Sequence, residues 1–168
     1  VSLKILKKKL AFKNSKILLV GNLSNQNKII KKSNNNENIV LVAPEGVESE
    51  NIKLFKFSLE CAKKNSEIKF LLRVHPVIDF KKILNYLNLE LKKMPKNIII
   101  SNSKMDKDLK RCKFILYRGS GAVISATINH IFPIYYEDRK SVNLDPLSIY
   151  FKKKNYVSNE NEFSKLVS

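Results

Sequence analysis

The chain has 168 residues, a formal net charge of +17 and 43% hydrophobic residues. This composition excludes a disordered tail and predicts one globular domain, or one half of a larger two-domain enzyme. The positive charge is nearly all lysine, scattered among many asparagines and isoleucines, as AT-rich codons specify. Nucleic-acid readers rely on arginine forks and clustered basic faces, so a nucleic-acid partner is not favoured. Peripheral contact with an anionic membrane is favoured somewhat more.

The cysteines and the apolar stretches give information on the cellular localisation. Cys61 and Cys112 lie in predicted elements without metal-ligand spacing, which is typical of reduced, buried thiols. No apolar stretch approaches the roughly 20 residues that span a bilayer, and the basic opening lacks the apolar region of a signal peptide. We therefore expect a cytoplasmic protein, with at most a peripheral position at the inner membrane face.

The first part of the chain is predicted to be separate from the rest. Residues 1–37 read as an N-terminal segment and linker, with a basic amphipathic helix at 1–12 and one strand at 16–21. The stretch 22–38 is rich in asparagine and lysine, which indicates a loop or interdomain linker. We place a second domain at residues 38–168.

Strands and helices alternate from residue 38 onward. Predicted strands cover residues 39–43, 68–74, 98–101, 114–117 and 131–136, with another near Tyr156 and Val157. Predicted helices begin at Ser49, after a cap at Asp79, at Met105, at Ser120 and near Asn159, and the second carries Phe80, Ile83, Leu84, Leu87 and Leu91 on one face. Such alternation predicts an α/β fold, a Rossmann-like, doubly wound, mostly parallel sheet with helices on both faces. An antiparallel α+β fold would need hairpin turns, and no Asn-Gly or Asp-Gly pair joins neighbouring strands.

Polar residues follow four of the predicted strands. Ligands of a parallel sheet bind outside the carboxyl ends of its strands, so these loops form the candidate site. The loops are residues 44–46, 73–76, 101–103 and 117–121. They carry cations, hydroxyls, backbone donors and one carboxylate, a set that suits phosphate and sugar.

The turn at Gly119, Ser120 and Gly121 is predicted to hold an anion. A helix opening at Ser120 would direct backbone N–H groups at the turn, and Arg118 would add a positive charge. The turn does not match a dinucleotide fingerprint, because Ile124 stands where a glycine is required, and it is neither a Walker loop nor a lipase-like elbow. The alternative is a tight strand-to-helix turn with no ligand.

Two further residues, His75 and Glu45, have both a functional and a structural interpretation. His75 is held extended by Pro76 and could donate to a phosphate with Arg73, or it could satisfy a nearby carbonyl. Glu45 could be a base or a ribose contact, or a carboxylate at a helix start. His130 lacks such neighbours and is interpreted as structural. No metal-binding motif appears, so neither a metal nor a cofactor is expected.

In order along the chain, these motifs resemble the C-terminal, donor-binding half of bacterial glycosyltransferases with two Rossmann-like domains (GT-B) that build surface carbohydrate. The resemblance covers about residues 38–151 and rests on A-P-E-G, R-V-H-P, S-N-S, Y-R-G-S-G-A-V-I-S-A, F-P-I-Y-Y and N-L-D-P-L. Bacterial sialyltransferases and polyol-phosphate polymerases of similar build also carry an H-P pair and a serine-rich turn.

The resemblance implies a domain that binds the nucleotide part of an activated sugar. It implies donor and phosphate binding by Arg73, His75, Ser101, Ser103, Arg118, Gly119, Ser120 and Gly121, and nucleotide contacts by Glu45, Gly46 and Ser125. Ser125 stands where such families often place a glutamate that holds the ribose, and Asn129 and His130 stand where a glycine usually precedes the next strand. These departures leave open an inactive copy.

The function expected from this resemblance is transfer of a sugar from a nucleotide-activated donor to a surface glycan or a lipid-linked acceptor. The base that deprotonates the acceptor would come from an amino-terminal domain, so this chain alone would be an incomplete enzyme. The alternatives are half of a nucleotide-sugar epimerase of the same architecture, and a non-catalytic basic α/β module that binds nucleic acid or an anionic membrane.

Overall fold

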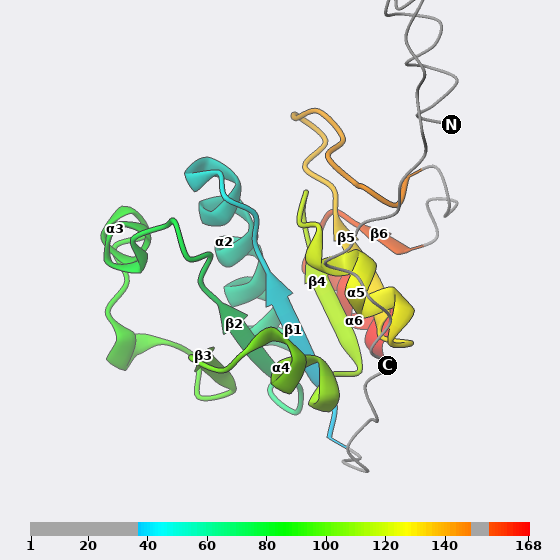
Figure 1. The fold of residues 1–168 in the computed structure, drawn as a ribbon. Helices are drawn as coiled ribbons and strands as arrows, with labels where there is room; N and C mark the ends of the chain where they lie inside the picture. Colours follow the sequence, from blue (N-terminus) through cyan, green and yellow to red (C-terminus); the bar gives the residue numbers. More distant parts are fainter. Residues whose placement is uncertain (1–36, 149–154) are drawn as a thin grey trace, which may run out of the picture.

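The structure is a computed structural model that describes residues 37–148 and 155–168. The predicted helix at 1–12, the strand at 16–21 and most of the predicted linker lie outside these residues. The described part of the chain contains one six-stranded sheet in the order β3-β2-β1-β4-β5-β6 (Figure 1). Its strands are β1 (Ile39–Ala43), β2 (Lys69–Arg73), β3 (Ile98–Ser101), β4 (Phe114–Tyr117), β5 (Phe132–Tyr136) and β6 (Tyr156–Val157).

All five strand pairings of this sheet are parallel, which confirms the predicted Rossmann-like fold. The chain runs outward from β1 through β2 to β3 and then returns to place β4 on the other side of β1. The strand order therefore reverses between β1 and β4. In doubly wound sheets, such a reversal leaves a crevice at the carboxyl ends of the two strands.

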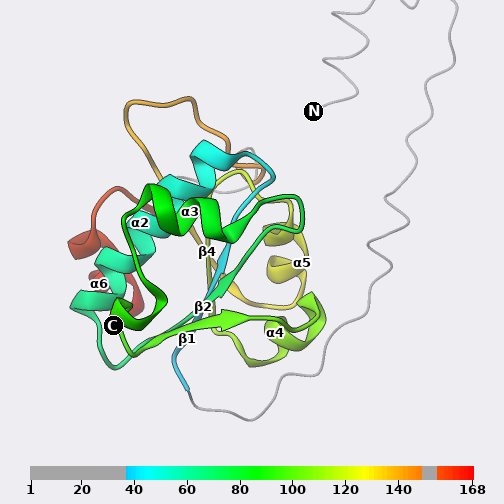
Figure 2. The same ribbon diagram turned by 90° about the vertical axis from the view of Figure 1, so that its left-hand side faces the viewer.

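Helices cover both faces of the sheet (Figure 2). The helices are α2 (Glu48–Lys64), α3 (Phe80–Tyr86), α4 (Met105–Arg111), α5 (Ala122–Ile128) and α6 (Glu160–Val167), with a short 3₁₀ helix, η2 (Leu91–Lys93). Helices α2, α3 and α6 lie on one face, and α4 and α5 lie on the other. None of the helices in the described ranges combines the length and the apolar character needed to cross a membrane.

The central strand β1 shows why both faces need cover. All five of its residues are buried, and their side chains alternate between two cores. Val40 and Val42 belong to the core under α2, α3 and α6, whereas Leu41 and Ala43 belong to the core under α4 and α5. A parallel strand buried on both faces is a continuous apolar run, and this is the signal that predicted β1 at its observed bounds.

The structure corrects two helix predictions. The predicted apolar stripe that ran to Leu91 breaks, because α3 ends at Tyr86 and Asn88 adopts a left-handed conformation with φ of 48°. Leu91 consequently lies in η2 and is 57% exposed. Helix α5 begins at Ala122 rather than at Ser120, with Gly121 as its N-cap residue.

The cap of α6 gives a test of the fold. The side chain of Asn159 accepts hydrogen bonds from the backbone N–H groups of Asn161 (3.1 Å) and Glu162 (2.9 Å). Asn159→Ala should lower the free energy of unfolding by about 1 kcal/mol, measured by urea denaturation, because two N–H groups at the helix start lose their acceptor. Asn159→Asp keeps an acceptor and is the matched control. Equal stability of the alanine variant and the wild type would contradict the role of this cap.

Candidate ligand-binding pocket

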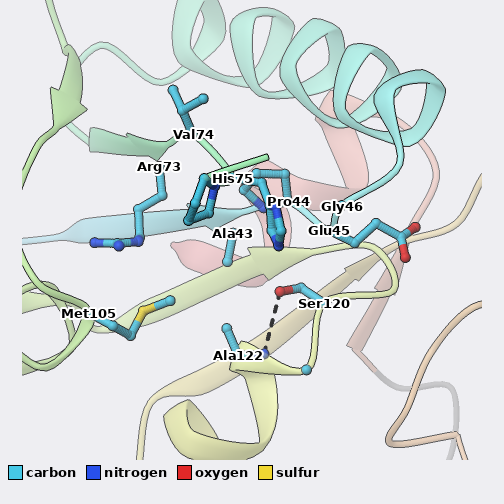
Figure 3. A pocket seen from close by; sticks show the side chains of 12 residues that line it. Ala43, Pro44, Glu45, Gly46, Arg73, Val74, His75, Met105, Ser120 and Ala122 are labelled. Atoms are coloured by element: carbon cyan, nitrogen blue, oxygen red, sulfur yellow. Dashed lines mark hydrogen bonds between the residues drawn. The ribbon is translucent and has the colours of Figure 1, made fainter. Parts of the chain in front are cut away.

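A cavity of about 430 Å³ lies at the carboxyl ends of β1, β2 and β4, where the strand order reverses. Three loops and the first residue of α4, Met105, surround it (Figure 3). The lining comprises residues 43–46, 73–76, 105 and 120–122. Six of the predicted site residues meet here, namely Glu45, Gly46, Arg73, His75, Ser120 and Gly121.

The loop after β1 is held in place by a residue that the sequence analysis missed. Asn51 of α2 is fully buried, and its side-chain amide donates to the backbone carbonyls of Glu45 (2.5 Å) and Val47 (2.7 Å). Buried backbone carbonyls need such partners. An asparagine one helical turn before Phe55, on the apolar stripe of a predicted helix, is the signal that could have identified it.

His75 packs closely against this loop. A Cβ atom placed on Gly46 would lie 3.3 Å from Cε1 of His75, so glycine allows the imidazole to approach the backbone. The backbone N–H of Val77 lies 3.5 Å from Nδ1 of His75. This long contact favours the tautomer with its proton on Nε2, because Nδ1 then serves as the acceptor. An Nε2–H group is a donor suited to a phosphate oxygen.

Glu45 lies against the backbone of the turn after β4. Gly119 has φ of 74°, and a Cβ atom placed on it would lie 2.6 Å from the carboxyl atoms of Glu45. Burial and the neighbouring Glu50 raise the pKa of Glu45, against the opposing effect of Arg118 and His75. Its Oε1 is buried without a hydrogen-bond partner in the part of the chain that the structure describes. The carboxylate is therefore held against the turn at the edge of the pocket, with one of its oxygens enclosed by the protein.

Ser120 and Gly121 form the opposite wall of the pocket. The side chain of Ser120 points to the left in the view of Figure 3, into the pocket, and its hydroxyl accepts a hydrogen bond from the backbone N–H of Ala122 at 3.4 Å. A Cβ atom on Gly121 would meet nothing within 4 Å, so the surface over this residue is open. A hydroxyl beside an open stretch of backbone leaves room for a polar ligand.

Arg73 reaches the pocket from the end of β2, on the same side as Met105 (Figure 3). Its Nη1 bonds to the carboxylate of Asp108 and donates to the backbone carbonyl of Ser103 at 2.8 Å. Ser101 donates through its hydroxyl to the same carboxylate at 2.5 Å. Ser101 and Ser103, predicted as phosphate ligands, thus contact Asp108 and Arg73 and are not part of the pocket lining.

The structure turns Arg118 away from this pocket, contrary to its predicted contribution to the anion site. The guanidinium is buried and bonds to Glu50, the hydroxyl of Tyr135, and the backbone carbonyls of Tyr136 and Val142. Side chains alternate along β4, so Tyr117 faces α4 and α5 whereas Arg118 faces α2. Arg118 instead lines a second cavity of about 200 Å³ beside the loop after β5.

Two other predicted residues lie outside the lining. Ser125 belongs to α5, one turn beyond the pocket wall, and Gly119 supports the pocket through its contact with Glu45. Among residues 37–148 and 155–168, no three histidine, cysteine, aspartate or glutamate side chains gather as metal ligands would. Binding without a metal stays an expectation.

Comparisons with known proteins returned little. No family model matches the chain, and no curated protein matches it. A solved structure described as the glycotransferase of kitacinnamycin matches with a TM-score of 0.47 and 14% identity, over 76% of this chain and 30% of that one. The chain thus spans less than a third of the protein it matches. At this level of similarity, the function has to be argued from the residues of the site.

Gly119→Ala tests the contact between Glu45 and the turn. The substitution should lower the free energy of unfolding by about 1–2 kcal/mol, because alanine is strained at a positive φ and its Cβ would displace the carboxyl group. Gly121→Ala is the matched control, since its φ is −64° and its Cβ position is open. Thermal and urea unfolding give the measurement. Equal losses in the two variants would contradict the contact.

The raised pKa of Glu45 predicts a pH dependence of stability. A carboxyl whose pKa is higher in the folded state binds its proton more tightly there, so its contribution to stability falls as pH rises above about 4.5, its ordinary value. Glu45→Gln removes this penalty. The stability of the variant relative to the wild type should therefore increase between about pH 4 and pH 7. A pH-independent difference in urea midpoints would contradict the shift.

Proposed function

We propose that the chain is the donor-binding part of a glycosyltransferase, and that the pocket binds the nucleotide part of a nucleotide-activated sugar. One observation carries the proposal: Arg73, His75, Glu45 and Ser120, from three separate loops, line one cavity at the strand reversal of a doubly wound sheet. Nucleotides bind such sheets at this crevice, because loops from both halves of the sheet converge there.

The two basic side chains suit a phosphate leaving group. As the bond between sugar and phosphate breaks, negative charge accumulates on the departing phosphate oxygens. Arg73 offers a fixed positive charge, and His75 offers an Nε2–H donor. Donors fixed before the reaction stabilise developing charge without reorganisation, and they can do so without a metal when enough of them converge.

Glu45 and Ser120 suit the remainder of the donor. Glu45 lines the pocket, where a carboxylate can accept hydrogen bonds from hydroxyls such as those of a ribose, and the hydroxyl of Ser120 can donate to phosphate. With Glu45 engaged by the donor, the base that activates a glycan or lipid-linked acceptor comes from outside this pocket. We therefore expect the 168-residue chain to bind donor without turning it over.

Isothermal titration of the 168-residue chain with UDP-, GDP-, CDP- and CMP-linked compounds tests the proposal. One nucleotide class should bind selectively, and His75→Ala should weaken that binding about tenfold or more, because a charge-assisted hydrogen bond is lost.

His130→Asn is the matched control for the histidine substitution. His130 lies outside the pocket lining with φ of 57°, a conformation that asparagine tolerates, so the affinity should be unchanged. Absence of binding by all four compounds would overturn the proposal. Steeply salt-dependent binding to DNA, RNA or acidic vesicles without nucleotide selectivity would instead favour the non-catalytic basic module.

A further inference from the structure

The structure assigns Asp108 a positioning role: its buried carboxylate orients the guanidinium of Arg73 for the phosphate of the ligand. This inference rests on the proposed function, because it supposes that Arg73 contacts a phosphate. Asp108 itself lies on α4, outside the pocket lining.

The parallel register brings the participating residues together. Arg73 and Ser101 are Cα partners at the carboxyl ends of β2 and β3, so their side chains emerge on the same face of the sheet. That face is covered by α4, whose Asp108 is completely buried above the two strands. One carboxylate oxygen, Oδ2, bonds to Arg73 and accepts the hydroxyl of Ser101 at 2.5 Å.

The bonds of Arg73 divide its guanidinium into two parts. Nη1 contacts Asp108 and donates to the carbonyl of Ser103, which uses both of its N–H groups. Nε and Nη2 have no hydrogen-bond partner within residues 37–148 and 155–168. They form one edge of the planar fork, the geometry with which arginine binds two oxygens of a phosphate at once. The protein thus anchors one nitrogen and leaves one edge for a ligand.

The buried pair of Asp108 and Arg73 is better explained by the orientation that it gives the guanidinium than by a contribution to the stability of the fold. Removing two charges from water is costly, and their mutual attraction roughly offsets that cost, so a buried ion pair contributes little net stability. The second carboxylate oxygen, Oδ1, is buried without a partner among the described residues, which adds to the cost. An arginine already fixed in one rotamer, in contrast, loses less conformational entropy when a phosphate binds. The pair of Asp108 and Arg73 therefore contributes to ligand affinity more than to folding stability.

The same geometry gives Ser101 its place in the network. Its hydroxyl holds the oxygen of Asp108 to which Arg73 is bonded, and it also accepts the backbone N–H of Ser103 at 3.2 Å. Ser101 therefore acts on the ligand through Asp108 and Arg73. Ser101 is thus a positioning residue that does not itself contact the ligand.

The substitution Asp108→Asn distinguishes the positioning role from a purely electrostatic effect, because the two predict opposite changes in ligand affinity. The carboxylate repels an anionic ligand, so removing its charge would tighten phosphate binding if charge alone mattered. If orientation dominates, the neutral amide holds the guanidinium less firmly, and affinity for the selected nucleotide should fall roughly tenfold. Asp106→Asn removes the same charge from an exposed position on the same helix, and is the matched control.

A double-mutant cycle gives the decisive measurement. Titrations of the 168-residue chain carrying Arg73→Ala, Asp108→Asn and both substitutions should show that Asp108→Asn loses its effect once Arg73 is absent. Ser101→Ala should weaken binding less than Asp108→Asn and also only when Arg73 is present. It serves as a milder second variant should Asp108→Asn fold poorly.

A measurement on the free protein keeps this inference separate from the proposed function. The Nε–H group of Arg73 should be rigid in ¹⁵N relaxation of the wild type and mobile in Asp108→Asn. Equal rigidity, or tighter nucleotide binding by Asp108→Asn, would overturn the positioning role and leave the proposed function standing. If no nucleotide binds the wild type, inorganic pyrophosphate serves as the probe in the same cycle. Binding of pyrophosphate alone would overturn only the nucleotide assignment, and binding of neither would overturn both.

Discussion

Burial of both faces of a parallel sheet is the constraint on which this structure depends. The strands of the sheet centre are apolar on each side, so their polar residues are confined to the strand ends and the loops that follow. Parallel pairing then brings those ends to one edge, and the reversal of strand order between β1 and β4 parts the helices there. The pocket lies at this edge because the sheet leaves no other place for converging polar groups.

Buried polar groups hold the loops of that edge in place. Asn51 bonds two carbonyls of the loop after β1, and Arg118 bonds the carbonyl of Tyr136 at the end of β5 and that of Val142 in the loop that follows. Asp145 accepts the hydroxyls of Tyr117 (2.7 Å) and Tyr156 (2.8 Å), and it caps the N–H of Leu147. Loop carbonyls and N–H groups removed from water need such partners, and loops fixed in this way present a preorganised site.

The arrangement of charge at the edge follows from the alternation of side chains along each strand. Arg73 faces α4 and is paired with Asp108, whereas Arg118 faces α2 and is paired with Glu50. Two arginines that stand at the ends of nearby strands therefore belong to opposite faces. No lysine lines the pocket, and the lysines within residues 37–148 and 155–168 are exposed, apart from the half-buried Lys53. The polar character of the pocket therefore comes from a few individually placed groups, Arg73, His75, Glu45 and Ser120.

The sequence by itself determined the fold class, the bounds of β1, β3, α4 and β4, and the loops that meet at the pocket, because periodicity and apolar runs are local signals. Tertiary structure decided which polar residues line the pocket. Arg118, Ser101 and Ser103 were predicted at the site but lie outside the pocket lining. Arg118 pairs with Glu50 on α2, and Ser101 bonds to Asp108 on α4. Asn51 was missed although its partners lie just before its own helix and its position on the apolar stripe marks it. Asp108 escaped prediction, since a polar residue on a helix reveals a partner on a strand only when the two elements pack together.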